Sequence, residues 1–216
     1  MFDLTRKFFA GFLISVSLIL APAVIQAAEQ QEQAKEEAAT VKFLVENLEA
    51  SANELGADFV SLDKAVTDSE KAMQYAKENL DKLIDKVGLR VKEFDENGEI
   101  WTRLDALMNS WQDNEKIVAE KATNNPAFEK IADKWAEKID GLRTLRNSIG
   151  EQHSEMAALL QSLIRKKDLV VEYIKLGAAD EVLKSLGKIH GRMVEINQNM
   201  SSIVDQATTV AGATPN

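Results

Sequence analysis

The sequence predicts an all-α protein, an elongated antiparallel bundle of three to four long helices with coiled-coil-like heptad seams. Apolar residues recur at alternating spacings of three and four between Ala34 and Val87, and again between Val182 and Val210. This spacing places them on one narrow face of a helix, which must pack against a partner helix. The chain has only three prolines and ten glycines, and we find no convincing strand pattern.

The N-terminal segment, residues 1–28, is typical of a secretory signal peptide. Arg6 and Lys7 precede an apolar stretch, and Ala27 offers a small residue for cleavage after residue 27 or 28. We therefore expect a periplasmic or otherwise exported protein. The apolar stretch is also close to the length of a bilayer-spanning helix. If it is not cleaved, it would anchor the protein in the inner membrane with the rest of the chain outside the cytoplasm.

The remaining chain is expected to form one helical-bundle domain over residues 29–211, with a frayed tail at 212–216. The first helix is expected to be continuous, because Ser69 is the only polar member of its seam. Turn signals at Asn97-Gly98, Pro126 and Gly177 separate it from later helices. The expected helices cover about 30–93, 99–122, 126–176 and 179–210.

The short connection at Gly177 makes the last two helices an antiparallel hairpin. The third helix carries an apolar residue every seven positions from Phe128 to Val170, which matches the seam of the fourth. The sequence leaves open whether the second and third helices are continuous across Pro126. The bundle therefore has either three or four helices.

Composition excludes several functional classes. The chain contains no cysteine, which excludes disulfides, thiolate metal sites and covalent haem attachment. Its net charge of −9 disfavours nucleic-acid binding, which requires lysine and arginine facing phosphates. Gly150 and Gly187 stand three residues before the two histidines, His153 and His190, where a di-iron bundle requires glutamate. We predict no catalytic residue, metal or cofactor.

A basic patch is the first candidate binding site. The predicted hairpin register brings basic residues of the third and fourth helices to the same level. The patch comprises Arg165, Lys166, Lys167, Lys184, Lys188 and Arg192. Such a cluster on an acidic protein can bind an anionic membrane surface or an acidic partner. The alternative is a solvated face neutralised by nearby acids such as Asp168.

A tryptophan cluster is the second candidate. Trp101, Trp111 and Trp135 lie in the middle of the chain and could line an apolar ligand pocket between helices. The alternative is that they fill the bundle core where helices change direction.

These patterns predict an exported, non-enzymatic scaffold or adaptor of the cell envelope. The long first seam exceeds what the second helix can cover, which favours self-association as a homodimer. If the second and third helices are continuous, the helix lengths resemble those of BAR domains. That resemblance implies a dimer that binds curved membranes through the basic patch. A small-ligand or cofactor-binding four-helix bundle is the other alternative.

Overall fold

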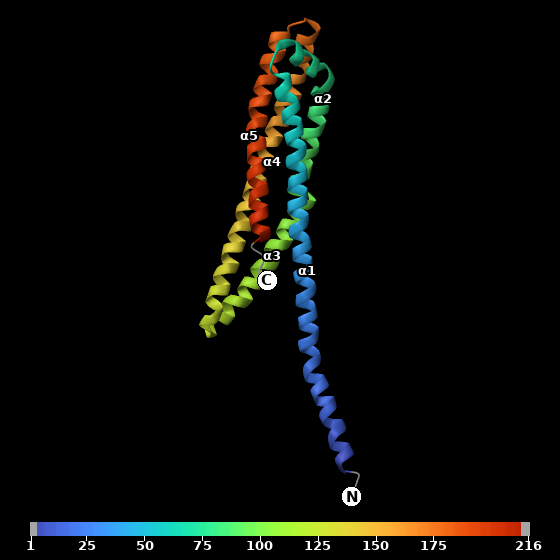
Figure 1. Ribbon diagram of the computed structural model, residues 1–216, viewed down its shortest axis with the longest axis vertical. Helices are drawn as coiled ribbons and strands as arrows, with labels where there is room; N and C mark the ends of the chain where they lie inside the picture. The colour runs from blue at the N-terminus through green and yellow to red at the C-terminus, as the bar shows by residue number, and fades with distance from the viewer. Residues whose placement is uncertain (1–3, 213–216) are drawn as a thin grey trace. The chain divides into compact units, whose positions relative to one another are not determined.

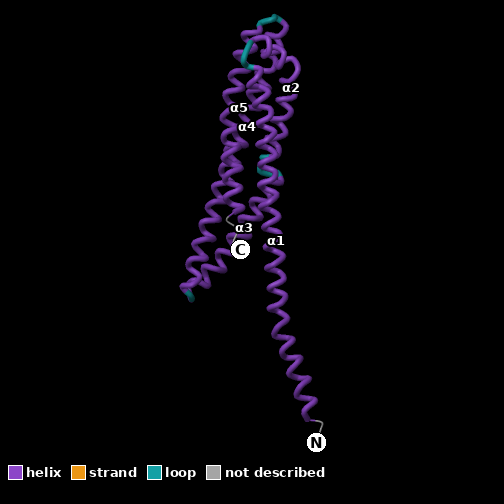
Figure 2. The backbone as a smooth tube through the Cα atoms, in the orientation of Figure 1, coloured by secondary structure: helices purple, strands orange, loops and turns teal. Residues whose placement is uncertain are grey.

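A computed structural model describes the backbone of residues 4–212 and the side chains of residues 31–212. Within this range the protein is all-helical and contains no strand, which confirms the predicted class (Figures 1 and 2). The helices are α1 (Leu4–Ala65), α2 (Ser69–Glu93), α3 (Glu99–Asn124), α4 (Glu129–Lys175) and α5 (Ala179–Gly212), and a 3₁₀ turn, η1 (Pro126–Phe128), precedes α4.

The chain divides into two compact units, residues 1–40 and 41–216. In the first unit the structure describes only a helical backbone and the side chains of residues 31–40. The predicted signal segment, residues 1–28, lies outside the residues with described side chains, as do residues 213–216 of the tail. No helix built from the described residues is both long enough and apolar enough to cross a membrane. All contacts discussed below belong to the second unit.

The expected single helix over residues 30–93 is wrong, because the chain breaks between α1 and α2. Asp68 adopts an extended backbone conformation (φ −154°, ψ 163°), and its side chain accepts a hydrogen bond of 2.8 Å from the Lys71 amide. This is an N-cap, which satisfies a free amide at the start of α2. The apolar spacing continues on both sides of the break, so the seam alone does not reveal it.

The structure also separates the second and third predicted helices. Asn125 is extended (φ −151°, ψ 106°), and its side chain accepts a hydrogen bond of 3.1 Å from Ala127. Pro126 occupies the first position of the following turn, where its missing N–H costs nothing. Because α3 and α4 are distinct helices, the continuity on which the BAR resemblance depended is not met.

The turn between α4 and α5 is closed by Gly177, whose φ of 67° lies in the left-handed region. Gly177 N–H donates to Ile174 O at 3.2 Å, and Ala178 N–H donates to Tyr173 O at 2.9 Å. These two bonds form a Schellman motif, which satisfies the last carbonyls of α4. Gly177 ends the helix as the sequence predicted.

Ion pairs fix the direction of α2 against the second-unit part of α1. Arg90 of α2 contacts Glu54 of α1 at 2.8 Å, and Lys86 pairs with Asp58. Glu93 accepts a hydrogen bond of 3.3 Å from Ser51. Residue numbers rise along one helix as they fall along the other, so α1 and α2 are antiparallel.

The helices α2 and α3 follow one another along α4. Asp81 of α2 pairs with Lys167 at 2.8 Å, and Asp105 of α3 pairs with Arg146 at 3.0 Å. Between them, Phe94 is fully buried in the connection. Both helices therefore run antiparallel to α4, as Figure 1 shows.

The helix α5 completes this part of the fold by packing on α4 and α1. Gln152 of α4 donates to Ile196 O at 2.9 Å, and His190 of α5 contacts Asp63 of α1 at 3.0 Å. The apolar side chains of α1, α2, α3, α4 and α5 pack into one continuous core. Its fully buried large side chains include Leu48, Leu62, Leu83, Leu104, Leu142, Ile149, Met156 and Leu159.

Candidate functional site

Three of the six predicted patch residues lie together on α4 and α5. Burial, followed by the positive charges of Lys188 and Arg192, lowers the pKa of Lys166. Arg192 also donates a hydrogen bond of 3.3 Å to Ala158 O of α4. Among the described residues these three cations form no ion pair within 4.0 Å. We call Lys166, Lys188 and Arg192 the basic triad.

The other three patch residues are engaged elsewhere. Lys167 reaches across to Asp81 of α2, and this hydrogen bond raises the pKa of Lys167. Lys184 lies 2.6 Å from Glu181, whose hydrogen bond raises the pKa of Lys184. Arg165 donates to Gln161 O at 3.2 Å. The sequence could not separate Lys167 from the triad, because its partner Asp81 comes from a distant part of the chain.

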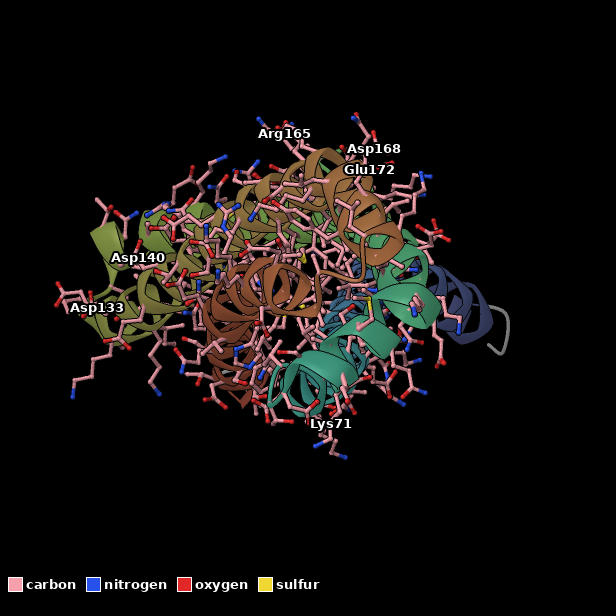
Figure 3. The ribbon with its side chains drawn as sticks, turned by 90° about the horizontal axis from the view of Figure 1, so that it is seen from above. Lys71, Asp133, Asp140, Arg165, Asp168 and Glu172 are labelled. Atoms are coloured by element: carbon pink, nitrogen blue, oxygen red, sulfur yellow. The ribbon has the colours of Figure 1, made fainter. Side chains whose placement is uncertain are left out.

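Figure 3 shows Arg165, Asp168 and Glu172 on the outer side of α4. Arg165 therefore shares one face of α4 with two carboxylates, at spacings of three and seven residues.

Trp101 holds the connection between α2 and α3. Its indole Nε1 donates a hydrogen bond of 2.7 Å to Phe94 O. The Arg146 guanidinium stacks on the ring at 4.6 Å from its centroid, a cation–π contact. Gly150 of α4 lies against the ring, and a Cβ there would be in ordinary van der Waals contact with it at 3.5 Å.

The other two tryptophans form a separate pair at the far end of the core. The rings of Trp111 and Trp135 meet edge to face with centroids 6.2 Å apart. The Lys138 ammonium lies 5.0 Å from the Trp111 ring and 4.9 Å from the Trp135 ring. Such contacts are ordinary core interactions of aromatic residues. The structure therefore does not bring Trp101, Trp111 and Trp135 into one cluster.

Both histidines lie at helix contacts. His190 stacks on Phe59 of α1 with ring centroids 5.2 Å apart and also contacts Asp63. His153 lies near Asp95 and contributes to the lowered pKa of that carboxyl, whose main cause is the hydrogen bond from the Asn97 amide. The described residues contain no group of three histidine, aspartate or glutamate side chains that could hold a metal ion.

A surface that the sequence did not single out lies at the end of the α3–α4 hairpin. Between Trp111 and Lys138, both buried, no residue from 112 to 137 is buried. Ile117 and Ile131 are 51% and 43% exposed, although both belong to helices with apolar faces. We call residues 112–137 the hairpin tip.

The hairpin tip extends beyond the helices that cover the rest of the core. Gly141 of α4 lies against Val210, near the end of α5. A Cβ added to Gly141 would lie 3.5 Å from Val210 Cγ2. On the other side, Arg103 stacks on Phe43, near the start of the second-unit part of α1, at 4.1 Å. Figure 1 shows α3 and the start of α4 continuing past the end of α5 as a pair. Within the second unit, the tip therefore has two helices where the body has four.

Comparisons of the chain with protein-family models, with curated proteins and with solved structures give no match.

Proposed function

We propose that the chain is an exported, non-enzymatic helical scaffold of the cell envelope that self-associates through its hairpin tip. The observation that carries the proposal is the run of residues 112–137 in which apolar side chains occur but none is buried. An antiparallel helix pair without a buried seam gains little stability from packing. A second copy would supply the missing partner.

Symmetry favours the tip as the contact. Two tips that pack against each other restore four helices at a level where one copy has two, and each copy uses the same surface, as in most dimers. The tip carries charges of both signs, such as Lys116 and Asp113, which lie 3.1 Å apart, so opposite charges are available for pairing between two copies.

In this proposal the protein is an elongated antiparallel bundle whose heptad seams pair helices within and between chains. The long helices provide a framework for other envelope proteins, and export depends on the signal segment at residues 1–28. No enzymatic step is part of the proposal. Detecting the N-terminus of the protein in its native compartment by mass spectrometry tests export. A start at residue 28 or 29 supports it, and a cytoplasmic protein that retains residues 1–28 contradicts it.

Light scattering of the purified protein tests self-association. We expect twice the monomer mass at micromolar concentration, and the monomer mass for the double variant Ile117→Lys, Ile131→Lys. The matched control is Leu89→Lys, Ile164→Lys, because these two residues are each 53% exposed but lie on α2 and in the C-terminal third of α4. A monomeric wild type, or equal disruption by the control, contradicts the proposal.

The basic triad supports a second candidate function, binding of an anionic membrane surface. Three cations without an acidic partner attract phosphate groups, and the attraction weakens as salt increases. We expect Lys166→Gln, Lys188→Gln to weaken binding to phosphatidylglycerol vesicles. The control Lys167→Gln, Lys184→Gln removes equal charge from residues paired with Asp81 and Glu181. If both double variants bind equally, the triad has no special role.

A further inference from the structure

Two leucines with exposed side chains lie at the C-terminal end of α4. Leu176 is 77% exposed, the highest value among the exposed large apolar side chains that the structure describes, and Leu169 is 48% exposed. The Leu176 amide still donates a helical hydrogen bond of 3.0 Å to Glu172 O, and its backbone is helical (φ −80°, ψ −5°). The direction of the Leu176 side chain is therefore set by α4.

The two leucines share a face of α4 with Lys166 and Tyr173. These four positions are separated by three, four and three residues, a spacing that places them along one side of a helix. Leu169 lies about 4.5 Å along the axis from Lys166, and Leu176 lies about 10 Å further. Tyr173, between the leucines, is partly buried against the core. We call these four residues the α4 stripe.

Lys166 connects the α4 stripe to the basic triad. Burial, followed by the positive charges of Lys188 and Arg192, lowers the pKa of Lys166, so the cations of α5 lie near it. Asp168 is two positions from Lys166 in the sequence and therefore lies on another side of α4. The surface thus has apolar side chains toward the turn at Gly177 and positive charge behind them.

The carboxylates on either side of the turn are offset by neighbouring lysines. Glu172 of α4 lies 2.7 Å from Lys175, and Glu181 of α5 lies 2.6 Å from Lys184. These pairs leave the basic triad as the charge that a negatively charged surface meets beside the leucines.

We propose that Leu169 and Leu176 insert into an anionic bilayer at the boundary between headgroups and acyl chains, while the basic triad binds headgroup phosphates. Charge complementarity selects the bilayer as the partner, because cations border the apolar side chains. A fluid bilayer accepts protruding leucines without a matching groove. Tyrosine is enriched at membrane–water interfaces, which is where this orientation places Tyr173.

This inference rests on the second candidate function, membrane binding, and adds the depth and orientation of the contact. The hairpin tip includes the start of α4, whereas the α4 stripe lies at its other end (Figure 1). Membrane insertion therefore leaves the hairpin tip free to self-associate.

A fluorescent label at each leucine tests insertion. The chain contains no cysteine, so Leu176→Cys carrying an NBD fluorophore gives a single reporter. With phosphatidylglycerol vesicles we expect a blue shift of its emission and quenching by lipids that carry a nitroxide on the acyl chain. Leu169→Cys should behave in the same way. The matched control is Leu89→Cys, 53% exposed but on α2, whose label should remain in water.

Unlabelled variants separate the apolar and the electrostatic contributions. The double variant Leu169→Gln, Leu176→Gln should bind phosphatidylglycerol vesicles roughly tenfold more weakly or worse, because the transfer of two leucine side chains out of water is lost. Its binding should remain sensitive to salt, since the basic triad is intact. The control Leu89→Gln, Ile164→Gln replaces two side chains that are each 53% exposed and should bind like the wild type.

The outcomes distinguish this inference from the function on which it rests. Salt-sensitive vesicle binding with the Leu176→Cys label in water overturns insertion but leaves binding by the basic triad intact. Equal quenching of the Leu176→Cys and Leu89→Cys labels also overturns insertion at the α4 stripe. Absence of binding to phosphatidylglycerol vesicles overturns both, and equal binding to phosphatidylcholine vesicles contradicts the role of the triad.

Discussion

The indole Nε1 of Trp101 donates a 2.7 Å hydrogen bond to the carbonyl oxygen of Phe94. This bond ties the first turn of α3 to the residue at which α2 ends, so the two helices continue along α4 as successive segments. Both residues are buried, with Phe94 at 0% exposure. The connection between the helices therefore belongs to the core.

Replacing Trp101 with phenylalanine should destabilise the protein. Trp101→Phe retains a ring but removes the only N–H of the side chain, which leaves the buried Phe94 carbonyl without this donor. We expect the free energy of unfolding to fall by about 1–3 kcal/mol, measured by urea denaturation. An unchanged free energy would mean that the bond is dispensable and that the connection is held by apolar packing alone.

Replacing glycine with alanine should lower stability in the turn before α5 but raise it within α5. Gly177 has a φ of 67°, and Gly177→Ala should lower the free energy of unfolding by about 1–2 kcal/mol. Gly187 and Gly191 lie within α5, and a Cβ at either position meets nothing within 4 Å. Gly187→Ala or Gly191→Ala should therefore raise it by about 0.5–1 kcal/mol each. Thermal unfolding compares the three variants with the wild type. If all three change stability in the same direction, the left-handed conformation of Gly177 is contradicted.

Tyr75 should titrate at unusually high pH. Burial, and next the charge of Asp58, raises its pKa from 10.0 to about 12. Between these values the unfolded chain loses the phenolic proton while the native protein retains it, so stability decreases as pH rises through this window and is fully present below it. Tyrosinate absorbance of the wild type minus that of Tyr75→Phe should show a midpoint near 12. A midpoint near 10 would show that the phenol is exposed.

The break between α1 and α2 should depend on the Asp68 cap. Asp68→Ala removes the acceptor for the Lys71 amide and should lower the midpoint of thermal unfolding. Asp68→Asn removes the same charge but keeps an oxygen that can cap, so it should retain most of the stability. If the alanine and asparagine variants behave alike, charge rather than capping accounts for the effect.

Helix class and most helix ends could be predicted from the sequence, because seams, turns and terminating residues are local signals. Gly177 and Pro126 lie at helix boundaries as expected. The break at Asp68 was missed because Val66 and Met73 continue the apolar rhythm across it. The Thr67-Asp68-Ser69 run was the available signal, since such residues favour helix N-termini.

The candidate sites were less predictable, since they depend on contacts between helices. Lys167 and Lys166 are neighbours in sequence, yet one pairs with Asp81 of α2 and the other faces Lys188 and Arg192. The sequence predicted that the apolar face of the first helix is longer than the second predicted helix can cover. In the structure α2 folds back along α1, so less of this face is left without a partner helix. Two of the exposed apolar residues, Ile117 and Ile131, lie at the end of the α3–α4 hairpin.

Cysteine cross-linking tests the self-association of the hairpin tip most directly. The chain contains no cysteine, so a single introduced thiol reports only on contact between two copies. We expect Ile117→Cys or Ile131→Cys to form a disulfide-linked dimer rapidly under mild oxidation, and Leu89→Cys, similarly exposed on α2, to remain largely monomeric. Cross-linking at the tip that is no faster than at Leu89→Cys would contradict the account.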